Sequence, residues 1–429
     1  MTSPNAGTTP ASLPDRTEVL IVGGGPAGAL LGVLLARRGI DVLVVEKQAT
    51  LERDFRGETL AAPSHVTLRA LGFGPALDAH GFLETEGVTM RMEGREVFRV
   101  DYGRFAIGAL PIDIPQPALI GIFVAAGREL PTFSYRTSII CTGLVEEDGA
   151  VRGATFKTRN GGTAQVRARL VVGADGRFSK VRKAASIEAD ITPMARDFLS
   201  FKLPRPAGWG NRAELVVDHD RHLVVLPTFP DFLRVGTNLP KRGLGELRQA
   251  GFEAFRDGIV AIDPRLRELA AEHLTSWDDT GFLEIFTAEV AQWTRDGLVL
   301  IGDAAHTCTP ILGQGVNLAI QDTVCIAPVI AAALAKRSEV VRASEFTAFV
   351  ASRRKHKTMV TRFQRLQEGA LSVGSPARVA LRRLRYRALD RLPLKYRLFD
   401  RVINAPHPVD PVDIYTPEAP DAPAVDLAA

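Results

Sequence analysis

A glycine-rich turn near the start of the chain has the spacing of a dinucleotide-binding motif. Gly23, Gly25 and Gly28 fit the pattern GxGxxG, between an apolar run and an Ala/Leu-rich stretch. In such a turn the first glycine permits the tight bend, the second lets the backbone approach a pyrophosphate, and the third lets the following helix pack against the sheet. Pro26 suits the first turn of that helix, whose free N–H groups and partial positive charge would attract phosphates.

An acidic residue follows the next apolar run, where such a motif needs one. Glu46 lies 18 positions after Gly28, and its carboxylate can accept both ribose hydroxyls of an adenosine. Its negative charge would repel a 2′-phosphate. The turn, the strand and the acid together predict dinucleotide binding rather than a structural glycine turn, but they do not distinguish FAD from NAD.

Two further turns combine glycine with aspartate, and each follows an apolar run. Residues 173–177 read Gly-Ala-Asp-Gly-Arg, and residues 302–306 read Gly-Asp-Ala-Ala-His. The latter turn continues to residues 313–317, Gly-Gln-Gly-Val-Asn, where a long apolar stretch begins. Glycines at these positions would let the backbone come close to a ligand.

Taken in this order, the three motifs resemble those of the class A flavoprotein monooxygenases, the para-hydroxybenzoate hydroxylase-like group. The resemblance extends from about residue 17 to residue 400. Residues 53–59 are similar to that family's arginine-bearing flavin loop, and residues 114–116 are similar to the place where the family supplies a glutamine to the cofactor. The resemblance implies that the chain binds FAD.

The resemblance also implies a role for each motif. Glu46 would bind the adenosine ribose, Arg56 and Gln116 would contact the pyrophosphate and ribityl region, and Asp303 would accept a ribityl hydroxyl. Asp175 would lie in a turn that serves both FAD and incoming NAD(P)H. The helix after the third turn would point N–H dipoles at the flavin and stabilise its anionic reduced form. The residues implied to bind the cofactor are Gly23, Gly25, Pro26, Ala27, Gly28, Glu46, Lys47, Arg56, Gln116, Asp175, Gly302, Asp303, Pro310, Gly313, Gly315, Val316 and Asn317.

The chemistry implied by this resemblance is a hydroxylation in secondary metabolism. NAD(P)H reduces FAD, O₂ adds at flavin C4a, and the hydroperoxide transfers an electrophilic OH to an aromatic or polycyclic substrate, typically a phenol or polyketide. Only one GxGxxG follows a predicted strand, so NAD(P)H is expected to dock transiently. The protein would bind, orient and exclude water, because a wet site releases hydrogen peroxide.

Other functions are compatible with parts of this pattern. An FAD-dependent reductase or dehydrogenase of isoprenoid or polyketide double bonds would keep the same three motifs. A flavin-dependent halogenase is disfavoured, because the signature Trp-x-Trp-x-Ile-Pro is absent from the sequence. A non-enzymatic FAD-binding protein would consume no NAD(P)H with any substrate.

The sequence assigns no catalytic residue. Tyr102, Arg104, His219 and His222 are the candidates for activating a phenol by a base or a hydrogen bond. The two histidines form an HxxH without a third ligand at compatible spacing, so no metal site is expected.

Two motif residues also have a plainer interpretation. Asp175 could serve only as the cap of the helix after its turn. His306 lies beside Asp303, which suggests catalysis, but the resemblance places this stretch on the phosphate and ribityl side of the cofactor.

A parallel sheet must position these turns. Residues 17–22 and 41–46 have the apolar character of buried strands, and the stretch between them to about Arg38 is helical in pattern, which makes one βαβ unit. Residues 169–173 and 298–302 predict two more strands. Further segments predicted to be strands of a more antiparallel inserted sheet are Val97–Tyr102, Leu215–Val217, Leu223–Pro227 and Phe282–Phe286, and Val316–Ala335 is predicted to be a long helix.

The predicted fold class is therefore α/β, a Rossmann-like FAD-binding domain with an inserted mixed or antiparallel β-sheet substrate domain and C-terminal helices. The predicted parts are a disordered leader (1–16), a discontinuous FAD-binding domain (17–80, 110–195 and 285–360), a substrate-binding domain (81–109 and 196–284), a C-terminal helical segment (361–403) and a Pro-rich tail (404–429).

The composition is that of an ordinary globular protein. The 429 residues are 46% apolar and 24% charged, which excludes a disordered, collagen-like or coiled-coil chain. The net charge of +4 gives no reason to expect a nucleic-acid partner. Dispersed cysteines at 141, 308 and 325 predict a reducing, cytoplasmic compartment without a disulfide framework.

No membrane association is expected from the sequence. The longest apolar run, Val19–Ala36, is broken by a glycine cluster that suits a tight turn better than a membrane span. The arginine-rich stretch 378–401 is expected to be a solvated helical face or a subunit contact rather than a docking face for a membrane or an acidic carrier. A monomer or homodimer is expected.

Overall fold

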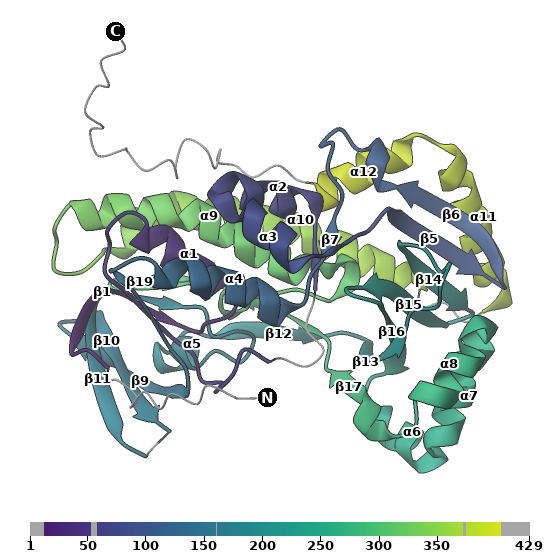
Figure 1. Ribbon diagram of the computed structural model, residues 1–429, viewed down its shortest axis with the longest axis horizontal. Coiled ribbons are helices and arrows are strands. Elements are labelled where there is room, and N and C mark those ends of the chain that lie inside the picture. The colour runs from purple at the N-terminus through teal and green to yellow at the C-terminus, as the bar shows by residue number, and fades with distance from the viewer. Residues whose placement is uncertain (1–12, 53–57, 160, 372–374, 405–429) are drawn as a thin grey trace, which may run out of the picture.

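A sheet that is parallel at its centre carries the glycine turn. The computed structural model describes residues 13–52, 58–159, 161–371 and 375–404 (Figure 1). Each strand from β20 to β8 pairs in parallel with its neighbour, whereas the edge strand β19 pairs antiparallel with β20. The strands in order across this sheet are β19 (Thr294–Arg295), β20 (Leu298–Leu300), β11 (Thr163–Gly173), β1 (Arg16–Val22), β2 (Val42–Val45) and β8 (Phe133–Arg136).

The strands predicted at 17–22, 41–46, 169–173 and 298–302 all lie in this sheet, in β1, β2, β11 and β20. Residues Val19–Ile21 are fully buried, because the sheet is covered on both faces, and this explains their unbroken apolar run. Two antiparallel strands, β9 (Ile139–Glu147) and β10 (Ala150–Thr158), extend from β11 at its side.

Three helices pack together over this sheet, α1 (Pro26–Ala36), α4 (Gln116–Arg128) and α9 (Gln314–Ala335). The Oγ1 atom of Thr323 on α9 donates to the Ala27 carbonyl of α1 at 3.1 Å. Within the described part of the chain, the segment Ile311–Ala335 is the one helix long and apolar enough to cross a membrane, yet 72% of its most apolar window is buried inside the protein. Such burial is typical of a core helix.

The second sheet has seven strands and lies beside the first (Figure 1). All of its pairs are antiparallel except the parallel pair of β14 with β5. The segments predicted around residues 97–102, 215–217 and 223–227 lie in this sheet. Its strands in order are β17 (Thr280–Leu283), β13 (Arg196–Pro204), β16 (Phe232–Pro240), β15 (Arg221–Thr228), β14 (Arg212–Asp218), β5 (Gly87–Met92) and β6 (Arg95–Asp101).

The single strand predicted at Phe282–Phe286 is wrong, because the chain changes sheets there. Strand β17 ends at Leu283, and β18 (Phe286–Val290) belongs to a separate sheet with β12 (Ala189–Pro193) and β21 (His306–Thr307). Between the two strands, the Ile285 N–H donates to the side-chain atom Asp197 Oδ1 at 3.0 Å instead of to a backbone carbonyl of a neighbouring strand. A buried aspartate therefore holds the crossing between the two sheets.

Helices cover the second sheet on both faces. One face packs against α7 (Phe252–Ile262) and α8 (Arg267–His273) through an apolar cluster that includes Phe201 and Phe255. Near β5 and β6, a different cluster joins the other face to Tyr386 and Phe399 of the C-terminal helices.

The C-terminal helices are α10 (Thr347–Leu371), α11 (Pro376–Arg391) and α12 (Leu394–Ile403). They confirm helix over the described part of 361–403. Helix α10 runs unbroken through the boundary predicted at 360/361, and the domain boundaries stay a prediction. The leader up to residue 12 and the tail from residue 405 lie outside the described residues.

Candidate active site

The three turns singled out in the sequence meet at the carboxyl ends of parallel strands. A Cβ on Gly23 would lie only 2.3 Å from the carbonyl oxygen of Ala174, so the first and second turns are in direct contact. Arg177 of the second turn lies 3.5 Å from the Asp303 carboxylate of the third turn. The buried Arg182 guanidinium also donates to the Ala304 carbonyl at 2.8 Å. Ligands of open α/β sheets bind at this edge.

Glu46 holds the glycine turn from the end of β2. Its Oε2 accepts the Gly24 N–H at 2.9 Å, and its Oε1 accepts the Gln48 N–H at 3.0 Å. The carboxylate is buried, whereas the next residue, Lys47, is exposed. The Tyr135 hydroxyl donates to the Gly24 carbonyl at 2.9 Å and fixes the other side of the turn.

The glycine turn has the shape that a pyrophosphate requires. A Cβ on Gly28 would lie 1.9 Å from the Gly23 carbonyl oxygen, so Gly28 serves close packing of helix and turn. A Cβ on Gly25 would meet nothing within 4 Å, so this glycine borders open space. Helix α1, whose first residues are Pro26 and Ala27, begins there without a side-chain cap. An uncapped helix N-terminus beside open space fits an anionic group such as the FAD pyrophosphate.

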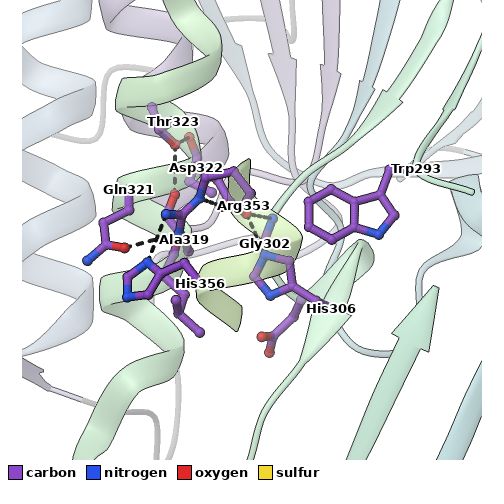
Figure 2. Close-up of polar contacts among 12 residues, drawn as sticks. Trp293, Gly302, His306, Ala319, Gln321, Asp322, Thr323, Arg353 and His356 are labelled. Atoms are coloured by element: carbon purple, nitrogen blue, oxygen red, sulfur yellow. Dashed lines mark hydrogen bonds and ion pairs between the residues drawn. The ribbon is translucent and has the colours of Figure 1, made fainter. Parts of the chain in front are cut away.

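The third turn is held from behind by a buried ionic network that the sequence did not reveal (Figure 2). Asp322 of α9 is fully buried; its Oδ2 accepts the Gly302 N–H at 2.9 Å and lies 2.7 Å from His306 Nε2. Its Oδ1 accepts from Arg353 Nε of α10 at 2.7 Å. Burial alone would raise the pKa of Asp322, but His306 and Arg353 lower it well below its ordinary range.

His306 therefore belongs to this network. Its ring is buried and packs against Trp293, with ring centroids 5.1 Å apart (Figure 2). These contacts give His306 a structural role in support of the third turn. Asp303, by contrast, remains partly exposed at the edge of the third turn.

The loop from Pro310 to Asn317 leads into α9. Gly313 is the N-cap residue in the left-handed conformation (φ +61°), no side chain caps this helix, and a Cβ on Gly315 would meet nothing within 4 Å. Val316 packs against the core. The Asn317 side chain is engaged by the backbone: Nδ2 donates to Thr59 O at 3.2 Å and to Gly313 O at 2.9 Å, and Oδ1 accepts the Ala61 N–H at 2.8 Å.

Three other predicted residues have the following places. Gln116 is buried and is the first residue of α4. Asp175 accepts the Lys180 N–H at 2.6 Å and the Val181 N–H at 3.1 Å, the first two N–H groups of the short helix α5 (Lys180–Ala184), whose N-cap residue is Ser179. Arg56 lies outside the described residues. Cofactor binding by these residues stays a prediction.

A cavity with a volume of about 330 Å³ lies between the second sheet, the loop 309–314 and the C-terminal helices. Pro310, Gly313 and Asn317 line it, so the cavity reaches the residues predicted to bind the flavin. The Gln364 side chain of α10 fixes this loop, because it accepts the Thr309 N–H at 3.2 Å and donates to the Thr309 and Ile311 carbonyls at 3.0 and 2.7 Å.

Two of the four candidates for substrate activation line the cavity. They are Tyr102, whose pKa is raised to about 12 by burial, and His222. Arg104 donates instead to the Tyr396 hydroxyl at 3.1 Å. His219 has an exposed side chain beside Asp218, 3.9 Å away.

A pair of carboxyl groups, Glu58 and Asp113, also lines the cavity and was missed in the sequence. They are brought together by two very short paired strands, β3 (Thr59–Leu60) and β7 (Ile112–Asp113). Glu58 Oε1 lies 3.2 Å from Lys202 Nζ and 3.0 Å from an Arg234 nitrogen. Asp113 accepts the Phe229 N–H at 3.0 Å. Burial, and secondly the charge of Glu58, raise the pKa of Asp113 to about 7.

This raised pKa predicts a pH-dependent stability that Asp113→Asn removes. The folded protein holds the Asp113 proton up to about pH 7, whereas an unfolded aspartate loses it near pH 4. Between these values the folded state binds more protons, so this contribution falls as pH rises, by at most about 1.4 kcal/mol per pH unit. Urea unfolding of the wild type and of Asp113→Asn from pH 5 to 8 measures it.

The exposed Asp231, which pairs with Arg205 at 3.0 Å, provides the matched control. Asp231→Asn should keep the wild-type slope between pH 5 and 7. Parallel stability profiles of the wild type and Asp113→Asn would contradict the assignment of a neutral-range carboxyl.

The sheet edge, the three converging turns and the adjoining cavity fit an FAD-dependent monooxygenase, the class that the following comparisons support. The chain belongs to the FAD binding domain family, whose model matches residues 16–363. It is 37% identical over 363 residues to a 6-methylpretetramide 4-monooxygenase of Streptomyces rimosus, covering 82% of this chain and 84% of the relative. It is 28% identical over 413 residues to a kynurenine 3-monooxygenase of Salinispora arenicola, covering 88% and 86%.

A solved structure shares the fold. The p-nitrophenol 4-monooxygenase PnpA of Pseudomonas putida DLL-E4 superimposes with a TM-score of 0.76 at 20% identity, covering 91% of this chain and 99% of that chain. The predicted fold class, the cofactor FAD and the FAD-dependent monooxygenase activity are thus confirmed.

Proposed function

We propose that the enzyme uses NAD(P)H and O₂ to hydroxylate a polycyclic phenol of the polyketide kind. The observation that carries this proposal is the mostly apolar cavity that reaches Pro310 and Gly313 at the flavin side. The relative from Streptomyces rimosus, named for its action on 6-methylpretetramide, supports this substrate class.

The chain's own residues would hold the cofactor as follows. The N-terminus of α1 and the open side of Gly25 would bind the pyrophosphate, Glu46 the adenosine ribose, and Asp303 the ribityl chain. The uncapped N-terminus of α9 at Gly313 would face the flavin ring. When bound, the flavin supplies electron transfer from NAD(P)H to O₂ and delivery of one oxygen atom to the substrate.

The remaining work of the protein is to orient the substrate and exclude water. Side chains such as Phe98, Leu215 and Phe399 form apolar walls around the cavity. A dry cavity favours oxygen transfer to the substrate over loss of hydrogen peroxide. We further propose transient docking of NAD(P)H, a monomer or homodimer without membrane association, and a cytoplasmic setting, in keeping with three buried free cysteines.

The proposal predicts a yellow protein whose NADH or NADPH oxidation is stimulated by polycyclic phenols. Absorption spectra, oxygen uptake and mass spectrometry of the product test it, since hydroxylation adds one oxygen atom. Oxidation of NAD(P)H onto an organic acceptor without O₂ would favour the reductase instead. A colourless protein that takes up no added FAD would contradict both activities.

A further inference from the structure

The floor of the cavity is one face of the second sheet. Because successive side chains of a strand point to opposite faces, Phe198 and Ser200 of β13 line the cavity, whereas Leu199 and Phe201 pack in the core on the other side. The same alternation places His222, Val224 and Leu226 of β15 and Arg234 and Asn238 of β16 in the cavity lining.

The two ends of this floor are polar and its middle is apolar. Arg234 and Asn238 lie four residues apart on β16, which separates them by about 13 Å. Between them lies Gly236, where a Cβ would be 2.0 Å from Phe198 Cε1, so the Phe198 ring lies over the glycine. An aromatic ring against a flat floor favours stacking with another planar ring.

The Arg234 end adjoins the flavin side of the cavity. Arg234 and Lys202 contact Glu58, at 3.0 and 3.2 Å. The next residue, Thr59, accepts a hydrogen bond from Asn317 at the start of α9. The opposite end, where Asn238 Oδ1 accepts the His222 N–H at 2.8 Å, lies about 13 Å along β16 from Arg234.

His222 has unused hydrogen-bonding capacity at this remote end. Its Nδ1 atom is buried and has no hydrogen-bond partner among the described residues. Burial, and then the charges of Arg196 and Arg382, lower the pKa of His222 to about 4, so the ring is neutral near pH 7. A neutral imidazole carries one N–H donor and one acceptor nitrogen. Because Nδ1 itself is covered by protein atoms, a polar group of a ligand would meet the partly exposed remainder of the ring, which lines the cavity.

We propose that His222 recognises an oxygen substituent at the far end of an extended fused-ring substrate whose reacting ring lies at the Arg234 end. This inference rests on the proposed function. His222 then determines substrate length and does not activate the reacting ring, because the ends of the floor are about 13 Å apart. A monocyclic phenol cannot span that distance, whereas a linear system of three or four fused rings with oxygens at both ends approaches it.

The test compares two ligands that carry the same pair of hydroxyl groups at different separations. They are 2,6-dihydroxyanthraquinone, with three rings, and 2,6-dihydroxynaphthalene, with two. Isothermal titration calorimetry on the FAD-loaded enzyme would compare the wild type with His222→Phe. The variant should raise the Kd of the three-ring ligand about tenfold, the value of one net hydrogen bond, and that of the two-ring ligand less than about twofold.

The matched control is His219→Asn, at the exposed histidine outside the cavity lining. Asparagine tolerates the positive φ of residue 219 (φ 53°), and both Kd values should stay at those of the wild type. An unchanged Kd of the three-ring ligand in His222→Phe would overturn the inference. So would an equal rise for both ligands, or a wild type that binds no three-ring ligand. A protein that takes up no FAD would instead contradict the proposed function, which separates the two failures.

Discussion

Replacement of Gly25 by valine is expected to abolish FAD binding and to leave the apoprotein folded. The backbone at Gly25 (φ −73°, ψ −172°) is extended and open to any residue. A Cβ there meets nothing within 4 Å, so no protein atom has to move. The added side chain would instead occupy the space in front of the α1 N-terminus, where the pyrophosphate is proposed to bind.

We expect the Kd of FAD to rise at least about 100-fold, which corresponds to about 3 kcal/mol, with a change in unfolding free energy within about 0.5 kcal/mol. Fluorescence titration of the apoprotein with FAD measures the former, and urea unfolding measures the latter. The matched control is Gly28→Ala, whose Cβ would lie 1.9 Å from the Gly23 carbonyl oxygen and should destabilise the fold itself. If the Gly25→Val protein bound FAD as tightly as the wild type does, the assignment of the pyrophosphate to this turn would be wrong.

Replacement of Asp322 by asparagine is expected to give the largest loss of stability. In the wild type, the Asp322 carboxylate lies 2.7 Å from the buried Arg353 guanidinium. The neutral amide keeps the size of the carboxylate but leaves this guanidinium without a charged partner. Breaking a buried ion pair in this way costs about 3–5 kcal/mol. Urea unfolding of the apoprotein at pH 7 measures this loss.

The sign of the pH dependence follows from the lowered pKa of Asp322. Its contribution to stability is fully present above the unfolded pKa, near pH 4, and is lost as pH falls through the folded value. The control is Glu345→Gln, because Glu345 pairs at 2.7 Å with the exposed Lys336 and such pairs contribute about 0–1 kcal/mol. If Asp322→Asn and Glu345→Gln lowered the free energy of unfolding equally, the buried network would contribute little to stability. Since Asp322 also binds the Gly302 N–H, a weakened FAD affinity should accompany the lost stability.

The parts of the site that lie within one strand, turn and helix were predictable from the sequence. Each apolar run that ends in a glycine or Gly-Asp turn is a local pattern, and parallel pairing then places those turns at one edge of the sheet. The position of Glu46 after the second strand is part of the same local pattern. The family resemblance added the role predicted for Asp303, which local pattern alone does not give.

The cavity's polar groups were not predictable, because they come from segments without a periodic pattern. Glu58 and Asp113 meet through two strands of two residues each, too short to recognise by alternation. Asp322 and Arg353 lie on different helices, and only the packing of α9 against α10 makes them partners. The side chain of Asn317, expected to serve the cofactor, is engaged by Thr59, Ala61 and Gly313, so it positions the loop.

The unbroken course of α10 links the two halves of the site mechanically. Arg353 near its start supports the third turn, Gln364 holds the loop 309–311, and Leu371 at its end lines the cavity. The helix thus fixes the spacing and the orientation of these three side chains, because each residue adds a rise of about 1.5 Å and a rotation of about 100°. One residue inserted between Arg353 and Gln364 would rotate Gln364 and Leu371 by about 100° relative to Arg353, away from the loop and the cavity that they contact. Surface loops can change length freely during divergence, but this stretch can change only by substitution.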